Sequence, residues 1–289
     1  MMDHPSSSTE TVAETAAETA AAWRARYGTD LGPAEGLAAL DAPLRQMLAH
    51  RSVRAYRDQA VDDRLLEGAV AAAQSASTSS NLQLWSVIAV RDAGTRARLA
   101  ELAGGQAHVA QAPLFLAWVL DLSRLRRLGR AQGVPTGGLD YLEGFVLGAV
   151  DVSLAAQNAA VSFERNGLGL VYIGGMRNHP EAVAELLGLP PAAMVLFGMC
   201  VGYPEPAELP PVKPRLPQAA VLHRERYDSG AEADIIAAYD AIFTGSDSAR
   251  ARGARPWSHG AVHRMRGPEA LSGRDRLRQA LHALGFPLA

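Results

Sequence analysis

The sequence predicts a layered domain of the α/β or α+β class, because short apolar runs alternate with stretches of helical periodicity. Residues 85–90 and 113–120 are apolar runs of strand length, and the helical pattern of residues 96–102 lies between them. Two further apolar runs, 170–173 and 194–201, are typical of buried strands. The alternation by itself does not distinguish between the two classes.

Helical signals account for most of the remaining core. Residues 36–49 carry apolar side chains at helical spacing, and Asp62 is placed to cap a second helix that ends before the hydroxyl-rich stretch 75–81. Residues 142–166 predict a long helix that is apolar on more than one face, so it should be buried in a core or against a partner subunit. Pro180 marks the start of another helix.

The chain is expected to have three parts. Residues 1–35 are rich in Ala, Ser, Thr and Glu and predict a mobile N-terminal extension, residues 36–228 form the core, and residues 229–289 form a C-terminal wrap. The elements expected in this last part are a helix over 231–243, a flexible basic loop over 250–266 and a helix over 274–284.

Composition excludes several classes of function. The 28 basic and 30 acidic residues nearly balance, which disfavours a nucleic-acid partner. Cys200 is the single cysteine, so no intrachain disulfide or cysteine-based zinc site is expected, and the compartment should be reducing. We expect a cytoplasmic protein, since we find neither a secretory signal nor a segment with the length and composition of a membrane span.

Two clusters of basic residues are candidates for binding a phosphate. Arg54 follows His50 and Arg51 at a helix end, where arginine forks could hold anionic oxygens, although such clusters are more often solvated caps. Lys213 and Arg215 stand in a segment stiffened by proline, and Lys213 is the single lysine among the 28 basic residues. Chance placement of that lysine is an equally good explanation.

Two further stretches could contact a flat ligand. Tyr172-Ile173-Gly174-Gly175 ends a strand with two residues that lack side chains, which would let a ring approach the backbone, although an ordinary turn explains the same pattern. The hydroxyls of residues 77–80 and the amides of Gln83 and Gln106 can donate and accept hydrogen bonds, but polar loops are common.

Several enzyme classes lack their motifs here. The sequence contains no Gly-x-Gly-x-x-Gly, Walker loop, nucleophile elbow or His-Glu-x-x-His, which disfavours a Rossmann dinucleotide site, phosphate-loop chemistry, esterase triads and zinc proteases. Cys200 lies inside an apolar run and is expected to pack there rather than to act as a nucleophile.

Taken in order, these motifs resemble the nitroreductase family, in its NADPH-dependent oxygen-insensitive nitroreductase and flavin reductase branch. The similarity runs from about residue 43 to the C-terminus, and the extension before Gly36 has no counterpart in it. The motifs that carry the resemblance are His50-Arg51-Ser52-x-Arg54, residues 77–83, Gly104-Gly105-Gln106-x-His108, Ala156-Gln157-Asn158, Gly167-Leu168-Gly169-x-x-Tyr172-Ile173-Gly174-Gly175 and Lys213-Pro214-Arg215-Leu216-Pro217.

The resemblance implies an α+β fold with a mostly antiparallel sheet, in an intertwined homodimer with FMN at the interface. It implies that FMN takes hydride from NADPH and passes electrons to nitroaromatic, quinone or flavin acceptors by a ping-pong mechanism, with no catalytic protein side chain. The residues expected to bind FMN are His50, Arg51, Ser52, Arg54, Thr78, Ser79, Ser80, Gln83, Gln106, Tyr172, Ile173, Gly174, Gly175, Lys213 and Arg215.

Arginines of the tail are expected to recognise the 2′-phosphate of NADPH, since the resemblance implies such contacts and a dianion favours guanidinium groups. A disordered arm that reflects arginine-rich composition is the alternative. Two other functions remain open: a flavin reductase that supplies reduced FMN to a partner monooxygenase, and a flavin-binding dimer without turnover. The candidate arginines are Arg250, Arg252, Arg255, Arg264, Arg266 and Arg274.

Overall fold

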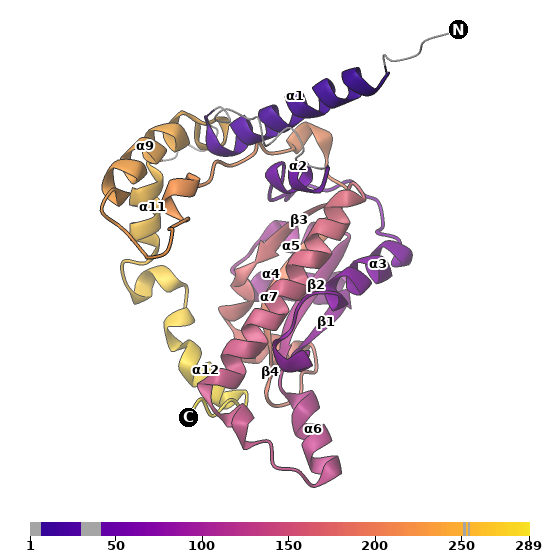
Figure 1. The fold of residues 1–289 in the computed structure, drawn as a ribbon. Coiled ribbons are helices and arrows are strands. Elements are labelled where there is room, and N and C mark those ends of the chain that lie inside the picture. Colours follow the sequence, from indigo (N-terminus) through magenta and orange to yellow (C-terminus); the bar gives the residue numbers. More distant parts are fainter. Residues whose placement is uncertain (1–6, 30–41, 251–252, 254) are drawn as a thin grey trace. The chain divides into compact units, whose positions relative to one another are not determined.

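The computed structural model describes residues 7–29, 42–250, 253 and 255–289 (Figure 1). The chain divides into two compact units. The first unit comprises Met1–Arg51 and Pro210–Arg266, and the second comprises Ser52–Leu209 and Gly267–Ala289. Each unit therefore combines segments that are distant in sequence. The predicted division into parts 1–35, 36–228 and 229–289 stays a prediction. The two compact units reflect which residues contact one another, and this does not report on the function or the mobility of a segment.

The second unit contains a four-stranded sheet with β1 (Trp85–Val90), β2 (Leu114–Asp121), β4 (Ala193–Gly202) and β3 (Gly169–Ile173) in this spatial order. All three neighbouring pairs are antiparallel. The predicted α+β class with a mostly antiparallel sheet is therefore confirmed. The spatial order explains why the sequence pattern alone was ambiguous, because β4 lies between β2 and β3 and the strands do not pair in chain order.

The side chains of β2 alternate between two hydrophobic cores, one on each face of the sheet. Trp118 packs into the core that includes residues of α3 (Asp63–Gln74) and α7 (Leu142–Arg165). Phe115 packs into the other core, which includes residues of α4 (Ala93–Leu102), α5 (Ala107–Gln111) and α8 (Pro180–Leu186). Helices thus cover both faces, and the strand reads as a continuous apolar run because it is buried on both sides.

Helix α7 is the longest helix of the second unit and lies along the sheet (Figure 1). Its residues Val152 and Phe163 are buried in the core. We expected no segment with the length and composition of a membrane span, but α7 is long and apolar enough to cross a membrane by these two criteria. It is the one such helix in the described ranges. Burial of one side against the sheet is typical of a core helix instead. Its outer side exposes Leu142, Val146, Val150 and Leu154, which we call the α7 stripe.

Local capping defines other boundaries in the second unit. The Asp62 carboxylate accepts a hydrogen bond from the Arg64 amide at 2.7 Å, which confirms it as the N-cap of α3. Pro180 occupies the first turn of α8, as predicted. The remaining helices of this unit are α6 (Ser123–Gln132), α12 (Leu277–Ala283) and the 3-10 helices Ser79–Asn81, Gly137–Asp140, Gly174–Arg177, Pro206–Glu208, Pro268–Leu271 and Arg274–Arg276.

The first unit is helical. Its elements are α1 (Ser7–Tyr27), α2 (Ala42–Leu48), the 3-10 helix Gln218–Ala220, α9 (Glu232–Gly245), α10 (Asp247–Arg250) and α11 (Trp257–Arg264). Helix α1 ends at Tyr27, and the next residue, Gly28, has a φ of +70° and approaches α9 so closely that a Cβ there would clash with Cγ2 of Ile242. Only glycine allows this contact at this backbone geometry.

The expected irregular loop over residues 250–266 is wrong for residues 257–264, which form α11. Tertiary contacts stabilise this helix despite its central Gly260. The Ser258 backbone amide donates to the Asp240 carboxylate at 2.9 Å, and the Trp257 ring packs edge-on against Tyr239 of α9 with centroids 5.6 Å apart. Both contacts join α11 to α9, a long-range arrangement that local propensity does not report.

Candidate functional site

The first unit brings together the two segments that carry four of its predicted phosphate ligands, His50 and Arg51 after α2 and Lys213 and Arg215 in the proline-rich segment. Arg26 of α1 donates to the His50 carbonyl at 2.6 Å and to the Lys213 carbonyl at 2.8 Å. The Arg51 guanidinium donates to the Pro210 carbonyl at 3.3 Å. Cationic side chains from two distant parts of the sequence are therefore attached to neighbouring backbone, an arrangement suited to an anion.

The segment around Arg215 is held by α9. The buried Tyr239 hydroxyl donates to the Pro214 carbonyl at 3.0 Å. Burial raises the pKa of Tyr239, while the positive charges of Arg215 and Arg26 act in the opposite direction. The tyrosine is therefore a neutral hydrogen-bond donor at physiological pH, and the guanidinium of Arg215 lies within its electrostatic reach.

The predicted NADPH arginines divide between the units. Arg250 pairs with Asp247 at 3.2 Å on the surface, Arg255 contacts the His259 ring at 3.2 Å, and both are exposed. Arg264 and Arg266 are exposed at and after the end of α11. Arg252 lies outside the described residues. Arg274 belongs instead to the second unit.

In the second unit, Gly174 and Gly175 lie beside Gln106 and Arg274. A Cβ on Gly175 would lie 2.6 Å from the Ala103 carbonyl oxygen and 2.8 Å from Gln106 Nε2, and one on Gly174 would lie 3.6 Å from Arg274 Nη1. The Gln106 amide donates to Ala103 at 2.9 Å. Gly174, Gly175 and Gln106, which are predicted to bind the flavin, are thus neighbours of Arg274, which is predicted to bind NADPH. There is no room for a side chain at position 175.

Two arginines, Arg177 and Arg274, lie close to the glycine turn. Arg274 Nε donates to the Asn178 side chain at 2.9 Å. Burial lowers the pKa of Arg177, and the nearby charge of Arg274 lowers it further. Two guanidinium groups close enough to repel each other are more stable with an anion nearby, so this end of β3 also suits a negatively charged ligand.

Ser52 and Arg54 lie at the other end of β3. Ser52 forms a parallel bridge with Leu170, and the exposed Arg54 guanidinium donates to the Ser52 carbonyl at 3.3 Å. His108 Nε2 is buried and has no hydrogen-bond partner in the described part of the chain. Burial lowers the pKa of His108, and the charge of Arg54 lowers it further, so this ring is neutral at physiological pH.

The hydroxyl-rich loop is fixed by Asp151, a buried residue of α7. Its carboxylate accepts hydrogen bonds from the Thr78 hydroxyl at 2.5 Å, the Ser79 amide at 3.2 Å and the Leu84 amide at 3.0 Å. Ser80, Asn81 and Gln83 all have positive φ, a backbone conformation that is unfavourable for residues other than glycine. The anchored carboxylate therefore holds a strained loop in one conformation.

Sequence reasoning missed Asp151. Its signal was a single carboxylate in the middle of an otherwise apolar helical stretch, since an aspartate is buried only when hydrogen-bonded or paired. Within the part of the chain that the structure describes, no hydrogen bond joins the loop from Thr78 to Gln83 with Gln106 or with Gly174 and Gly175. The loop and the glycine turn are separate groups in the second unit.

Tyr172 and Cys200 occupy the strands that support the glycine turn. The Tyr172 hydroxyl contacts Gln157 Oε1 of α7 at 3.3 Å, and its ring packs edge-on against Phe197. Burial raises the pKa of the Tyr172 phenol and that of the Cys200 thiol. Cys200 is fully buried in β4, which agrees with its predicted packing role, since only a thiolate is an effective nucleophile.

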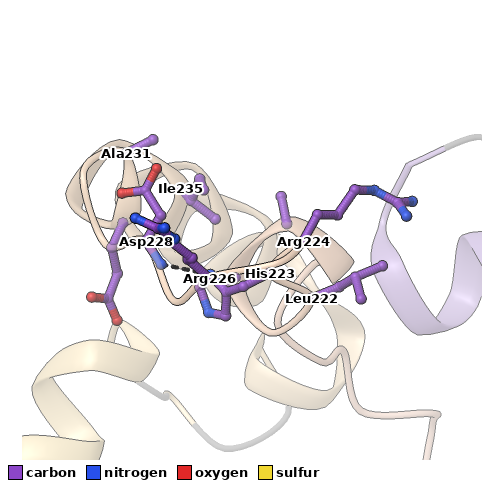
Figure 2. Close-up of a pocket in the computed structure, with 10 residues that line it drawn as sticks. Leu222, His223, Arg224, Arg226, Asp228, Ala231 and Ile235 are labelled. Atoms are coloured by element: carbon purple, nitrogen blue, oxygen red, sulfur yellow. Dashed lines mark hydrogen bonds between the residues drawn. The ribbon is translucent and has the colours of Figure 1, made fainter.

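We compared three cavities by whether the predicted flavin ligands line them. In the second unit, Gln83 lines a cavity of about 610 Å³ with Trp85 and Arg124, and a more apolar cavity of about 510 Å³ lies between α6 and the start of α7. In the first unit, a cavity of about 340 Å³ is lined by His223 and Arg226 among others (Figure 2). None of the predicted flavin ligands lines this last cavity.

Comparison with known proteins identifies relatives over most of the chain. Residues 47–203 match the family model described as "Nitroreductase family", and residues 213–289 match "Nitroreductase family, C-terminal domain". The oxygen-insensitive NADPH nitroreductase of Salmonella typhimurium is 43% identical over 194 residues, which span 67% of this chain and 78% of the relative. The FMN reductase (NADPH) of Bacillus subtilis is 39% identical over 186 residues, 64% of this chain and 74% of the relative.

Solved structures show the same fold. The structure of NfrA2 from B. megaterium has a TM-score of 0.80 and 37% identity, and the match covers 86% of this chain and all 100% of that chain. The NADPH:FMN oxidoreductase from Vibrio harveyi, complexed with NAD+, has a TM-score of 0.76 and 35% identity at the same coverage, 86% and 100%. Helix α1 lies outside both matching family models.

Proposed function

Because the chain belongs to the nitroreductase family, we propose that it is an FMN-dependent oxidoreductase that oxidises NADPH and reduces nitroaromatic, quinone or flavin acceptors. Relatives named NADPH nitroreductase, NADPH-flavin oxidoreductase and FMN reductase (NADPH) support both cofactors. The structural observation that carries the proposal is the glycine turn of Gly174 and the buried Gly175, which lies beside the Gln106 amide and the Arg274 guanidinium.

Each unit, taken by itself, contains residues that suit a part of FMN. In the first unit, Arg51, Lys213 and Arg215 supply cationic groups for its phosphate and His50 supplies an imidazole, and Arg26 holds the backbone of His50 and Lys213. In the second unit, the Gln106 amide packs against Gly175, where any side chain would clash, and this places an amide donor and acceptor at the glycine turn. The proposed ligands of the second unit are Ser52, Arg54, Thr78, Ser79, Ser80, Gln83, Gln106, Tyr172, Ile173, Gly174 and Gly175.

FMN, when bound, supplies hydride acceptance and donation at its N5 atom. The chain's own residues then bind and orient. The Gln106 amide, fixed on Ala103, offers its second N–H and its oxygen to the ring edge, and the glycines offer backbone amides. We propose no protein nucleophile, since the buried Cys200 thiol stays protonated, and ping-pong exchange requires only that donor and acceptor use one pocket in turn.

NADPH is proposed to be selected by arginines of the tail. Arg274 has the most specific support, because its guanidinium lies next to Gly174 while its Nε is held by Asn178. Arg250, Arg252, Arg255, Arg264 and Arg266 remain candidates in the first unit. A fixed guanidinium gains a charge-assisted contact with a 2′-phosphate that NADH lacks.

A homodimer is also part of the proposal. The α7 stripe exposes Leu142, Val146, Val150 and Leu154 by 53, 45, 48 and 42%, at a spacing of four residues along one helix face. A contiguous apolar face of this kind on a core helix is typical of a subunit interface. We expect a cytoplasmic protein whose partners are small molecules and a second copy of itself, and neither nucleic acid nor a membrane.

Anaerobic spectroscopy tests the function. The purified protein should show an oxidised-flavin absorption spectrum, NADPH should bleach it, and a nitroaromatic or quinone should restore it. A flavin that NADPH leaves oxidised would favour the binding dimer without turnover. Two relatives, an NADPH-flavin oxidoreductase and an FMN reductase (NADPH), are named for flavin reduction, the activity that the alternative of supplying reduced FMN to a partner monooxygenase would require. Efficient steady-state reduction of free FMN, compared with nitroaromatics, would support that role.

A further inference from the structure

The guanidinium of Arg26 in helix α1 is a buried charge, since this residue is 5% exposed. Burying a cation is costly unless its donors are satisfied. Arg26 Nε and Nη2 donate to the Leu48 carbonyl at 2.9 and 2.7 Å, Nη2 also donates to His50 at 2.6 Å, and Nη1 donates to Lys213 at 2.8 Å. Three carbonyls from two segments thus surround one side chain.

The backbone of α1 completes the same junction. The Arg215 amide donates to the Arg26 carbonyl at 3.0 Å, so Arg26 accepts from the proline-rich segment as well as donating to it. The neighbouring Arg24 on the same helix turn is exposed. Helix α1 is further held to α2 by the ion pair of Glu18 and Arg45 at 3.5 Å. The buried arginine is therefore the point at which α1, the end of α2 and residues 213–215 meet.

We propose that Arg26 is a positioning residue for the FMN phosphate. By fixing the backbone of His50 and Lys213, it would hold the side chains of both segments ready for one anion. This inference rests on the proposed function, because it takes His50, Lys213 and Arg215 as phosphate ligands. Helix α1 lies outside both family models, so the chain would use an added element to pre-order a cofactor site.

The physical reason is preorganisation. Without the Arg26 guanidinium, residues 213–215 would lose the hydrogen bond to the Lys213 carbonyl, and residues 48–50 would lose three hydrogen bonds. Both segments would then sample more conformations before binding. Phosphate binding would then have to order the backbone, and the conformational entropy lost would weaken the affinity. A planar guanidinium can reach three carbonyl oxygens in different directions, whereas the ammonium of lysine is a single point of charge.

The test compares FMN with riboflavin, which lacks the phosphate. The full-length protein, stripped of flavin, is titrated with each flavin as wild type and as the variants Arg26→Met, Arg26→Lys and Arg24→Met. We expect Arg26→Met to weaken FMN binding about tenfold or more while riboflavin affinity is unchanged, Arg26→Lys to show a smaller loss, and Arg24→Met to behave as wild type. Thermal unfolding of each apoprotein monitors folding.

Equal losses for FMN and riboflavin in Arg26→Met, or no loss for either, would overturn the inference, since a purely structural role would not distinguish the two flavins. If Arg26→Met does not fold, Arg26→Lys decides in the same way. Arg215→Ala separates this inference from the proposed function. A lowered preference for FMN in Arg215→Ala but not in the Arg26 variants overturns only the role of Arg26. Equal affinities in the wild type overturn the phosphate site as well.

Discussion

The Thr78 hydroxyl donates a hydrogen bond to the Asp151 carboxylate at 2.5 Å, although 73 residues separate the two in sequence. The same carboxylate receives the amides of Ser79 and Leu84. One acidic side chain of α7 therefore sets the start and the end of a loop that we propose to contact FMN.

Asp151→Asn should loosen that loop. An asparagine keeps the shape but replaces one acceptor oxygen by an NH2 group, which would face a donor. We expect the free energy of unfolding to fall by about 1–3 kcal/mol, measured by urea denaturation of the apoprotein. FMN affinity should fall as well. Asp140→Asn, which removes the charge of one partner in a partly exposed ion pair with Arg126, serves as the control and should have a smaller effect.

Arg215→Ala should weaken FMN binding by about tenfold or more, because a charged hydrogen bond to phosphate is worth about 1.5–3 kcal/mol. The variant should purify pale and regain activity when excess FMN is added. Absorption of the purified protein and activity as a function of added FMN measure both effects. Arg224→Ala, an exposed arginine of the same unit, should keep its colour. A fully yellow Arg215→Ala variant would contradict the phosphate assignment.

Gly175→Ala should disrupt the glycine turn. The new methyl group would lie 2.6 Å from the Ala103 oxygen and 2.8 Å from Gln106 Nε2, closer than atoms pack. The backbone or the Gln106 amide must move, at a cost of about 1–3 kcal/mol. We expect reduced stability and reduced flavin affinity, measured by thermal unfolding and flavin titration. Gly137→Ala is the control, since a Cβ there meets nothing within 4 Å.

NADPH preference should depend on at least one tail arginine. In a set of Arg→Ala variants at residues 250, 252, 255, 264, 266 and 274, we expect the ratio of kcat/KM for NADPH to that for NADH to fall at least about tenfold in one or more variants. Arg274→Ala is our first candidate. Arg130→Ala, on the surface of α6, should leave the ratio unchanged. A wild type and variants that treat both nucleotides alike would refute this assignment.

Val150→Glu should weaken the proposed dimer. The substitution places a charge in the centre of the α7 stripe, and burying an unpaired carboxylate in an interface is costly. Light scattering should show a dimeric mass for the wild type and a shift toward monomer for the variant. Val262→Glu, at an exposed valine of α11, is the control and should stay dimeric. A monomeric wild type with FMN bound would rule out the interface.

The elements that were predictable from the sequence depend on local signals. β1 matches the apolar run 85–90, and α7 begins at Leu142 as its periodicity indicates. Both were predictable because the buried positions of a strand or helix carry apolar residues at a characteristic spacing. The direction of strand pairing was not predictable from those runs, since apolar spacing is the same in parallel and antiparallel strands. The family resemblance supplied it.

What the sequence concealed is long-range. The Asp151 carboxylate accepts hydrogen bonds from residues 78–84, and the Arg26 guanidinium donates to carbonyls of residues 48–50 and 213. These partners are distant in sequence, so neither role follows from neighbouring residues. Arg26 was further hidden in an Ala-rich stretch that suggested an extension. Helix α11 was missed because Pro256 and Gly260 lower its intrinsic helicity, while contacts with α9 outweigh that cost.

The division of the first unit between both ends of the chain has a consequence for biosynthesis. His50 emerges from the ribosome long before Lys213, and at roughly 5–20 residues per second the delay is on the order of ten to thirty seconds. During that interval the Arg26 guanidinium has no Lys213 carbonyl to bind. The nascent chain can therefore bring together the two segments that we propose to bind the FMN phosphate only near the end of translation, when α9 and α11 have also been made.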